Sequence, residues 1–156
     1  MDNLFINQEL FLPTGDAGVS DALLRQWVAR RGGEGHEQAP FDRQVDLWWL
    51  ALCLGVQEGQ RAQVPAADRR TKFADGSILS SDPWRITHLS LLGIAELGED
   101  ALSRPAEILR MANEYVVTGI RLLRVVLEGA AEPALTLWSR LEIPADQSFP
   151  AVENLV

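Results

Sequence analysis

The longest amphipathic pattern in the chain lies between Ser103 and Gly129. Apolar residues recur there at steps of three and four, the spacing that places them on one face of an α-helix. The hydroxyl of Ser103 can cap the first turn, and Pro105 suits that turn because the N–H it lacks would have no helical partner. Gly129 can adopt the left-handed conformation that often follows a helix. The pattern therefore predicts a long central helix over residues 104–128.

The two faces of this helix predict different roles. Gly119 lies on the apolar face, where its cost of about 1 kcal/mol relative to alanine is acceptable if another helix crosses closely. On the polar face, two arginines can each pair with a glutamate four residues later. The arginines of this face are candidate partner-binding residues: Arg110, Arg121 and Arg124.

Two shorter helices are predicted in the N-terminal half. Ser20 is a suitable cap for a helix over residues 21–31. Asp42 is a suitable cap for a second helix over residues 43–54, and Gly55 is expected to end it.

Two further helices flank the central one in the sequence. Asp82 followed by Pro83 is a strong helix start, because a capping side chain precedes a proline at the first helical position. This apolar helix is expected to reach Leu97, with Gly98 as its stop. The short link to the central helix predicts that the two are antiparallel neighbours. A last amphipathic segment predicts a helix over residues 133–142.

The long connection over residues 55–81 is a candidate binding segment. Connections of this length are uncommon in compact domains and are usually functional or mobile. Apolar residues around Asp75 and Gly76 suggest either a small hairpin or an anchored loop within it. The connection also holds the one locally basic stretch of the chain, the basic loop, whose cations are candidate partner-binding residues: Arg61, Arg69, Arg70 and Lys72.

Taken together, the elements predict an all-α, single-domain bundle of about five helices. Residues 1–19 carry two short apolar runs, and we expect them to form an extended arm or one helical turn on the body. Residues 143–156 are expected to form a C-terminal tail that either moves freely or docks on the body or on a partner.

Composition and charge restrict the classes of function. A chain of 156 residues with 47% hydrophobic residues fits one domain with a substantial core. The formal net charge of −8 argues against general binding to nucleic acids or anionic membranes, but leaves room for a local basic patch. Cys53 is the only cysteine, and the first residues lack the pattern of a signal peptide. We therefore expect a cytoplasmic protein.

No catalytic signature stands out in the sequence. The cysteine and the histidines lack zinc-like spacing, no Gly-x-Ser-x-Gly motif is present, and the glycine-rich residues 32–35 are not followed by Gly-Lys-Ser or Gly-Lys-Thr. We predict no catalytic residues, no cofactor and no metal site. An enzyme built on His88 would require that side chain to be exposed in a cleft.

The order and spacing of positions between residues 41 and 128 resemble a family associated with bacterial DNA phosphorothioation (Dnd-type) defence systems, Dnd system-associated protein 4. The positions that carry the resemblance are Phe41, Val45–Leu54, Gly55, Arg61, Asp82, Ile86–Leu97, Ile108, Glu114-Tyr115, Gly119-Ile120 and Leu122-Leu123. The resemblance implies a non-catalytic accessory component of an anti-phage DNA-modification or restriction system. It carries over no catalytic residue.

Three hypotheses for function follow. The first is an adaptor that binds larger protein subunits of a defence complex through the basic loop and the arginines of the long helix. The second is a regulator that binds nucleic acid through residues 61–72. The third is an inhibitor whose acidic surface mimics DNA. A homo-oligomer is compatible with each of them.

Overall fold

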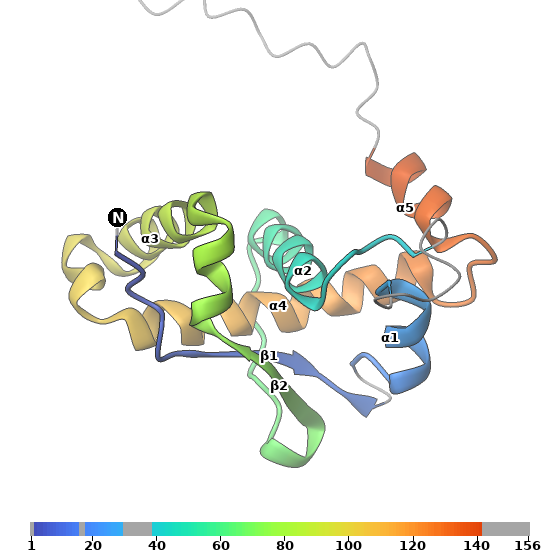
Figure 1. Cartoon of the computed structure of the whole chain (residues 1–156), viewed down its shortest axis with the longest axis horizontal. Helices are drawn as coiled ribbons and strands as arrows, with labels where there is room; N and C mark the ends of the chain where they lie inside the picture. The colour runs from blue at the N-terminus through green and yellow to red at the C-terminus, as the bar shows by residue number, and fades with distance from the viewer. Residues whose placement is uncertain (1, 16–17, 30–38, 142–156) are drawn as a thin grey trace, which may run out of the picture.

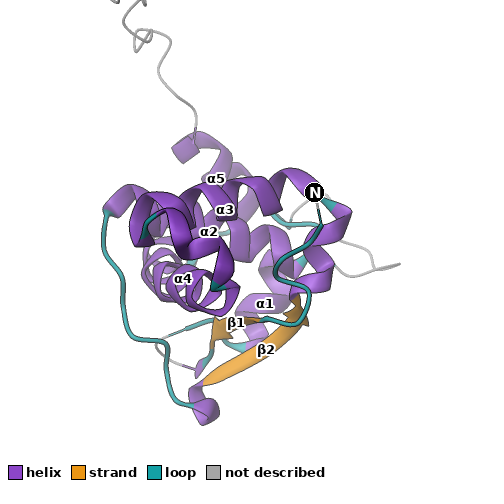
Figure 2. Ribbon diagram, turned by 90° about the vertical axis from the view of Figure 1, so that its left-hand side faces the viewer, coloured by secondary structure: helices purple, strands orange, loops and turns teal. Residues whose placement is uncertain are grey.

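The computed structural model describes residues 2–15, 18–29 and 39–141. Within these ranges the chain is mostly helical, and one small sheet accompanies the helices (Figures 1 and 2). The predicted all-α class is confirmed, with the sheet as an addition. The elements are β1 (Glu9–Pro13), α1 (Asp21–Trp27), α2 (Gln44–Glu58), η2 (Ala67–Arg69), β2 (Arg70–Asp75), η3 (Gly76–Ser81), α3 (Pro83–Leu97), η4 (Glu99–Ser103), α4 (Pro105–Leu127) and α5 (Pro133–Leu141), where η marks a short 3-10 helix.

The predicted central helix is confirmed as α4. Its apolar face is almost wholly buried, and both α2 and α3 pack on it. The predicted cap is wrong, because the hydroxyl of Ser103 donates to the carbonyl of Asp100 and so closes η4 instead. Arg104 is the residue before the first turn and makes no side-chain capping bond. Gly129 has a φ of 80°, as the predicted helix end requires.

The crossing of α2 and α4 depends on two glycines. A Cβ atom at Gly119 would lie 1.7 Å from the carbonyl oxygen of Ala51, which confirms the predicted close approach of another helix. A Cβ atom at Gly55 would lie 2.1 Å from the carbonyl oxygen of Tyr115. The prediction that Gly55 ends the second helix is therefore wrong. The helix continues to Glu58, and Gly55 allows the backbones of α2 and α4 to pack closely.

Helix α3 begins and ends as predicted, from Pro83 to Leu97. Figure 1 shows α3 and α4 running in opposite directions, so the predicted antiparallel arrangement is confirmed. Asp82 is the residue before the first turn, but its carboxylate accepts hydrogen bonds from an arginine and caps no backbone N–H.

The sheet corrects the prediction of a local hairpin. Residues 70–75 form β2, but β2 pairs antiparallel with β1 from the N-terminal arm, and the chain after Asp75 continues as η3. The arm is extended, one of the two predicted alternatives. Gly76 permits this arrangement, because a Cβ atom there would lie 1.8 Å from the carbonyl oxygen of Phe5.

The remaining elements close the core. Ser20 caps α1 as predicted, accepting a hydrogen bond from the N–H of Leu23. The prediction that this helix continues to residue 31 is wrong, because α1 ends at Trp27 and Val28 is extended and forms a β-bridge with Phe41. Residues 30–31 and the predicted tail over residues 143–156 lie outside the described residues. Buried side chains of the arm and of α1 to α5 form one hydrophobic cluster. Among the helices that the structure describes, none is long and apolar enough to cross a membrane.

Candidate functional site

A groove of about 560 Å³ lies between the N-terminal arm with β1, the loop before η2, and the first half of α4. We call it the polar groove. Its lining combines apolar side chains with amides and charged groups. Its lining residues are Asn7, Gln8, Glu9, Phe11, Gln63, Val64, Arg70, Ala106, Leu109, Arg110, Asn113 and Glu114.

The buried side chain of Asn113 fixes the two walls of this groove. Its Oδ1 atom accepts hydrogen bonds from the N–H of Phe11 and from the Nε1 of Trp48, both at 3.1 Å. Its Nδ2 atom donates to the carbonyl of Glu9 at 3.1 Å. One amide of α4 therefore sets the position of β1 and of a core tryptophan of α2.

The substitution Asn113→Ala is expected to lower the free energy of unfolding by about 2 kcal/mol, because it leaves buried hydrogen-bonding groups without a partner. The indole N–H of Trp48 is the most affected, since that side chain is fully buried. Urea unfolding followed by tryptophan fluorescence measures the change. Asn7→Ala is the matched control, because Asn7 lines the same groove but is exposed. Equal stability of the two variants would contradict the role of Asn113.

Two predicted partner-binding residues, Arg70 and Arg110, line the polar groove, and a third, Arg61, contacts its lining residue Glu114. The guanidinium carbon of Arg70 lies 4.4 Å from the ring centre of Phe11, a cation–π contact. Arg61 and Arg110 lie on either side of Glu114, each with a nitrogen 3.6 Å from a carboxylate oxygen. The basic loop and the arginine face of α4 thus meet at one carboxylate.

The other predicted residues lie elsewhere. Lys72 forms ion pairs with Glu9 and Asp75, at 3.0 and 2.6 Å. Arg124 pairs with its own helix neighbour, as predicted. Arg69 and Arg121 are exposed, and neither has an ion pair among the described residues. Acidic side chains lie between the cations of the basic loop. Its surface therefore carries both charges and does not form a continuous basic patch.

A second groove, of about 320 Å³, runs between α2 and α3 and is lined almost entirely by apolar side chains. We call it the apolar groove. His88 is exposed there, as the enzyme alternative requires, and its Nδ1 lies 2.7 Å from the carbonyl oxygen of Trp84, which makes Nδ1–H the donor. Desolvation raises the pKa of the Cys53 thiol, so the reactive thiolate is disfavoured. Its lining residues are Trp49, Leu52, Cys53, Val56, Gln57, His88, Leu89 and Leu92.

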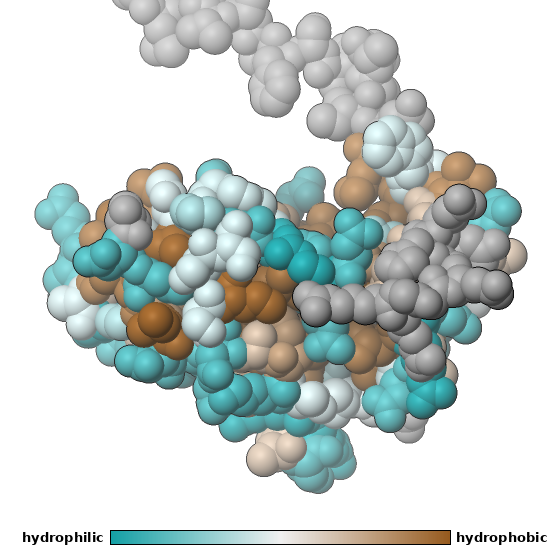
Figure 3. Space-filling view, viewed as in Figure 1, coloured by the Kyte–Doolittle hydropathy of each residue, from teal (hydrophilic) through white to brown (hydrophobic). Residues whose placement is uncertain are grey.

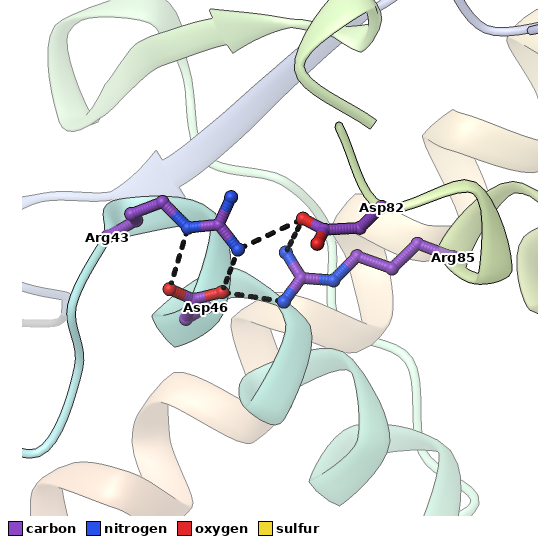
Figure 4. Close-up of polar contacts among 4 residues, drawn as sticks. All are labelled: Arg43, Asp46, Asp82 and Arg85. Carbon is purple, nitrogen blue, oxygen red and sulfur yellow. Dashed lines mark hydrogen bonds and ion pairs between the residues drawn. The ribbon is translucent and has the colours of Figure 1, made fainter. Parts of the chain in front are cut away.

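A network of four charges joins the starts of α2 and α3 (Figure 4). Arg85 is 95% buried and donates to Asp46 at 2.6 Å, while Arg43 donates to both Asp46 and Asp82 at 2.9 Å. The Arg85 guanidinium also lies close to two indole rings, those of Trp49 and Trp84, with its central carbon 5.4 and 4.9 Å from their centres.

This network was not predicted from the sequence. Each helix start holds an arginine and an aspartate three residues apart, which is a visible signal for a local ion pair. The contact between the two starts depends on the packing of α2 beside α3, so the spacing alone could not reveal it.

Comparisons with protein-family models, with curated proteins and with solved structures give no match for this chain. The site is therefore interpreted from its own geometry. Within the described ranges, no cluster of three or more His, Cys, Asp or Glu side chains is arranged to hold a metal ion.

Proposed function

We propose that this chain is a non-catalytic accessory subunit that binds an extended segment of a larger protein in the polar groove. The observation that carries the proposal is the meeting of the basic loop and α4 at this groove. Arg70 of β2 and Arg110 of α4 line the groove, and Arg61, in the loop before η2, pairs with the lining residue Glu114.

The lining of the groove favours a protein segment as the ligand. Apolar side chains such as Phe11 and Leu109 can receive an apolar anchor, while the surrounding amides can pair with peptide N–H and C=O groups. The arginines favour an acidic residue in that segment. Glu9 and Glu114 lie among them, so a phosphate backbone would meet like charges there as well as cations.

The resemblance to Dnd system-associated protein 4 suggests the kind of complex in which the chain binds this segment. The proposed partners are larger protein subunits of a bacterial anti-phage DNA-modification or restriction system in the cytoplasm. The proposal assigns no catalytic residue and no cofactor to the chain.

The test is co-purification of a full-length tagged chain with proteins of its native host, followed by mass spectrometry. The double variant Arg61→Glu/Arg110→Glu is expected to reduce recovery of the partner by about tenfold or more, because Arg110 lines the groove and Arg61 contacts the lining residue Glu114. Both side chains are well exposed, so the fold should tolerate the changes.

The matched control is Arg69→Glu/Arg121→Glu, which changes the net charge equally at exposed positions outside the groove. We expect recovery of the partner with this control to equal that with the unmodified chain. Equal loss in both double variants, or no partner with the unmodified chain, would contradict the proposal. A parallel titration with short duplex DNA at low salt tests the nucleic-acid alternative, which predicts tight, salt-sensitive binding.

A further inference from the structure

Arg70 differs from the other arginines of the chain because it is half-buried and has no counter-ion. It lines the polar groove, and no carboxylate lies within ion-pair distance of it among the described residues. Removing a charge from water destabilises a fold when no opposite charge compensates it. The fold therefore supplies no acidic partner for Arg70. The other arginines that lack an ion pair in the described ranges are all exposed: Arg25, Arg69, Arg121 and Arg140.

Local contacts hold the Arg70 guanidinium in place and leave one edge of it unused. Its central carbon lies 4.4 Å from the ring centre of Phe11, and its Nη1 donates a long hydrogen bond, 3.4 Å, to the carbonyl of Pro65. Its Nε and Nη2 atoms have no hydrogen-bond partner among the described residues, and neither atom is fully buried. These two nitrogens form the edge that can bind both oxygens of one carboxylate. Arg124 uses the same edge to bind Glu128, with both bonds at 3.0 Å.

The two carboxylates that line the polar groove are engaged with other cations. Glu114 lies 3.6 Å from both Arg61 and Arg110, and Glu9 pairs with a lysine of β2 at 3.0 Å. The charge of Arg70 is therefore left for a ligand to balance. The sheet side of the molecule, where β2 begins at Arg70, carries mostly hydrophilic residues in the view of Figure 3. These surroundings favour a charged ligand group over an apolar one at this end of the groove.

We propose that Arg70 binds the carboxylate of an acidic side chain in the extended segment that occupies the polar groove. Both oxygens of this Asp or Glu accept from the Nε and Nη2 atoms of Arg70, while the ring of Phe11 holds the guanidinium in place. One carboxylate balances the one uncompensated charge. The inference rests on the proposed function, and it adds which arginine binds the acid of the partner segment.

The first experiment finds ligands without knowledge of the native partner. A library of random linear peptides displayed on phage is selected against the full chain, and peptides that Arg61→Glu/Arg110→Glu also retains are discarded, because they bind outside the polar groove. The remaining peptides are expected to share an acidic residue, and selection against Arg70→Gln is expected to remove this preference. Arg69→Gln is the matched control, since Arg69 is the neighbouring arginine and is exposed outside the groove.

The second experiment is a double-mutant cycle measured by calorimetry. A selected peptide is synthesised with an amidated C-terminus, so that a terminal carboxylate cannot be the group that binds. Replacing its acidic residue by the corresponding amide should weaken binding to the unmodified chain by about tenfold or more. The same replacement should have no effect with Arg70→Gln. Arg70→Lys keeps the charge but lacks the two-nitrogen edge, and it should bind the acidic peptide about threefold or more weakly than the unmodified chain does.

The outcomes separate this inference from the proposed function. If the peptide's acidic residue contributes equally with the unmodified chain and with Arg70→Gln, the inference is overturned, while the groove remains a binding site for a segment. Groove-dependent peptides without a shared acidic residue would have the same consequence. Failure to select any peptide that depends on Arg61 and Arg110 would overturn both. Arg70→Lys tests the same claim should Arg70→Gln fail to fold, and an affinity equal to that of the unmodified chain would overturn it.

Discussion

Gly119→Ala is expected to lower the free energy of unfolding by about 3 kcal/mol or more, at the upper end of the range for overpacked cores. The added methyl group would lie 1.7 Å from the carbonyl oxygen of Ala51, so the backbones of α2 and α4 would have to separate. Separation would also disturb the reciprocal contact, in which Gly55 approaches the backbone of Tyr115. Urea unfolding followed by circular dichroism measures the loss.

Helix propensity alone predicts the opposite effect on stability. An alanine in place of a mid-helix glycine stabilises an isolated helix by about 1 kcal/mol. Gly93→Ala is the comparison within α3, because its methyl group would meet side-chain atoms of Ile108 at 2.5–3.2 Å and not a helix backbone. We expect a smaller loss of stability for this variant, since a side chain can shift more easily than two helix backbones can separate. A Gly119→Ala protein as stable as the unmodified chain would show that the crossing of α2 and α4 does not require a glycine.

Asp46→Asn is expected to lower the free energy of unfolding by about 3 kcal/mol near neutral pH, because it leaves the buried charge of Arg85 poorly compensated. The remaining carboxylate near Arg85 is that of Asp82, whose oxygen is 3.6 Å away. Two nitrogens of the Arg85 guanidinium already lack a hydrogen-bond partner, so little compensation is available elsewhere.

The effect of this substitution should depend on pH. Burial by itself would raise the pKa of Asp46, but hydrogen bonds from Arg43 and Arg85 outweigh it and hold the pKa below the ordinary value. A carboxyl group whose pKa is lowered by folding stabilises the fold fully above its unfolded pKa of about 4. That stabilisation is lost as the pH falls through the lower pKa of the folded state.

Urea unfolding at about pH 6 and at about pH 3 therefore gives the test, since the stability difference between the native chain and Asp46→Asn should shrink at the lower pH. Asp42→Asn is the control, because Asp42 is exposed and precedes the same helix. An Asp46→Asn effect of the same size at both pH values would mean that the charge of Asp46 does not stabilise the network.

The positions of the helices follow from local patterns in the sequence. The repeat of apolar residues at three and four steps is a local property of each helix, so the range of α4 and the starts of α1 and α3 could be predicted closely. The same repeat placed Gly119 on the packed face. It also placed Arg110 on the polar face, where the structure finds it paired with Glu114.

Contacts between segments that are distant in the sequence could not be predicted from local patterns. Pairing of β1 with β2 joins segments about 60 residues apart in the sequence, and neither strand is long enough to have a distinctive pattern of its own. The polar groove could not be predicted for the same reason. Its walls come from the arm, the basic loop and α4, and no single one of these segments has a sequence pattern that indicates a groove. Whether Gly55 ends a helix or allows two to cross depends on the approach of Tyr115, a contact that local spacing cannot specify.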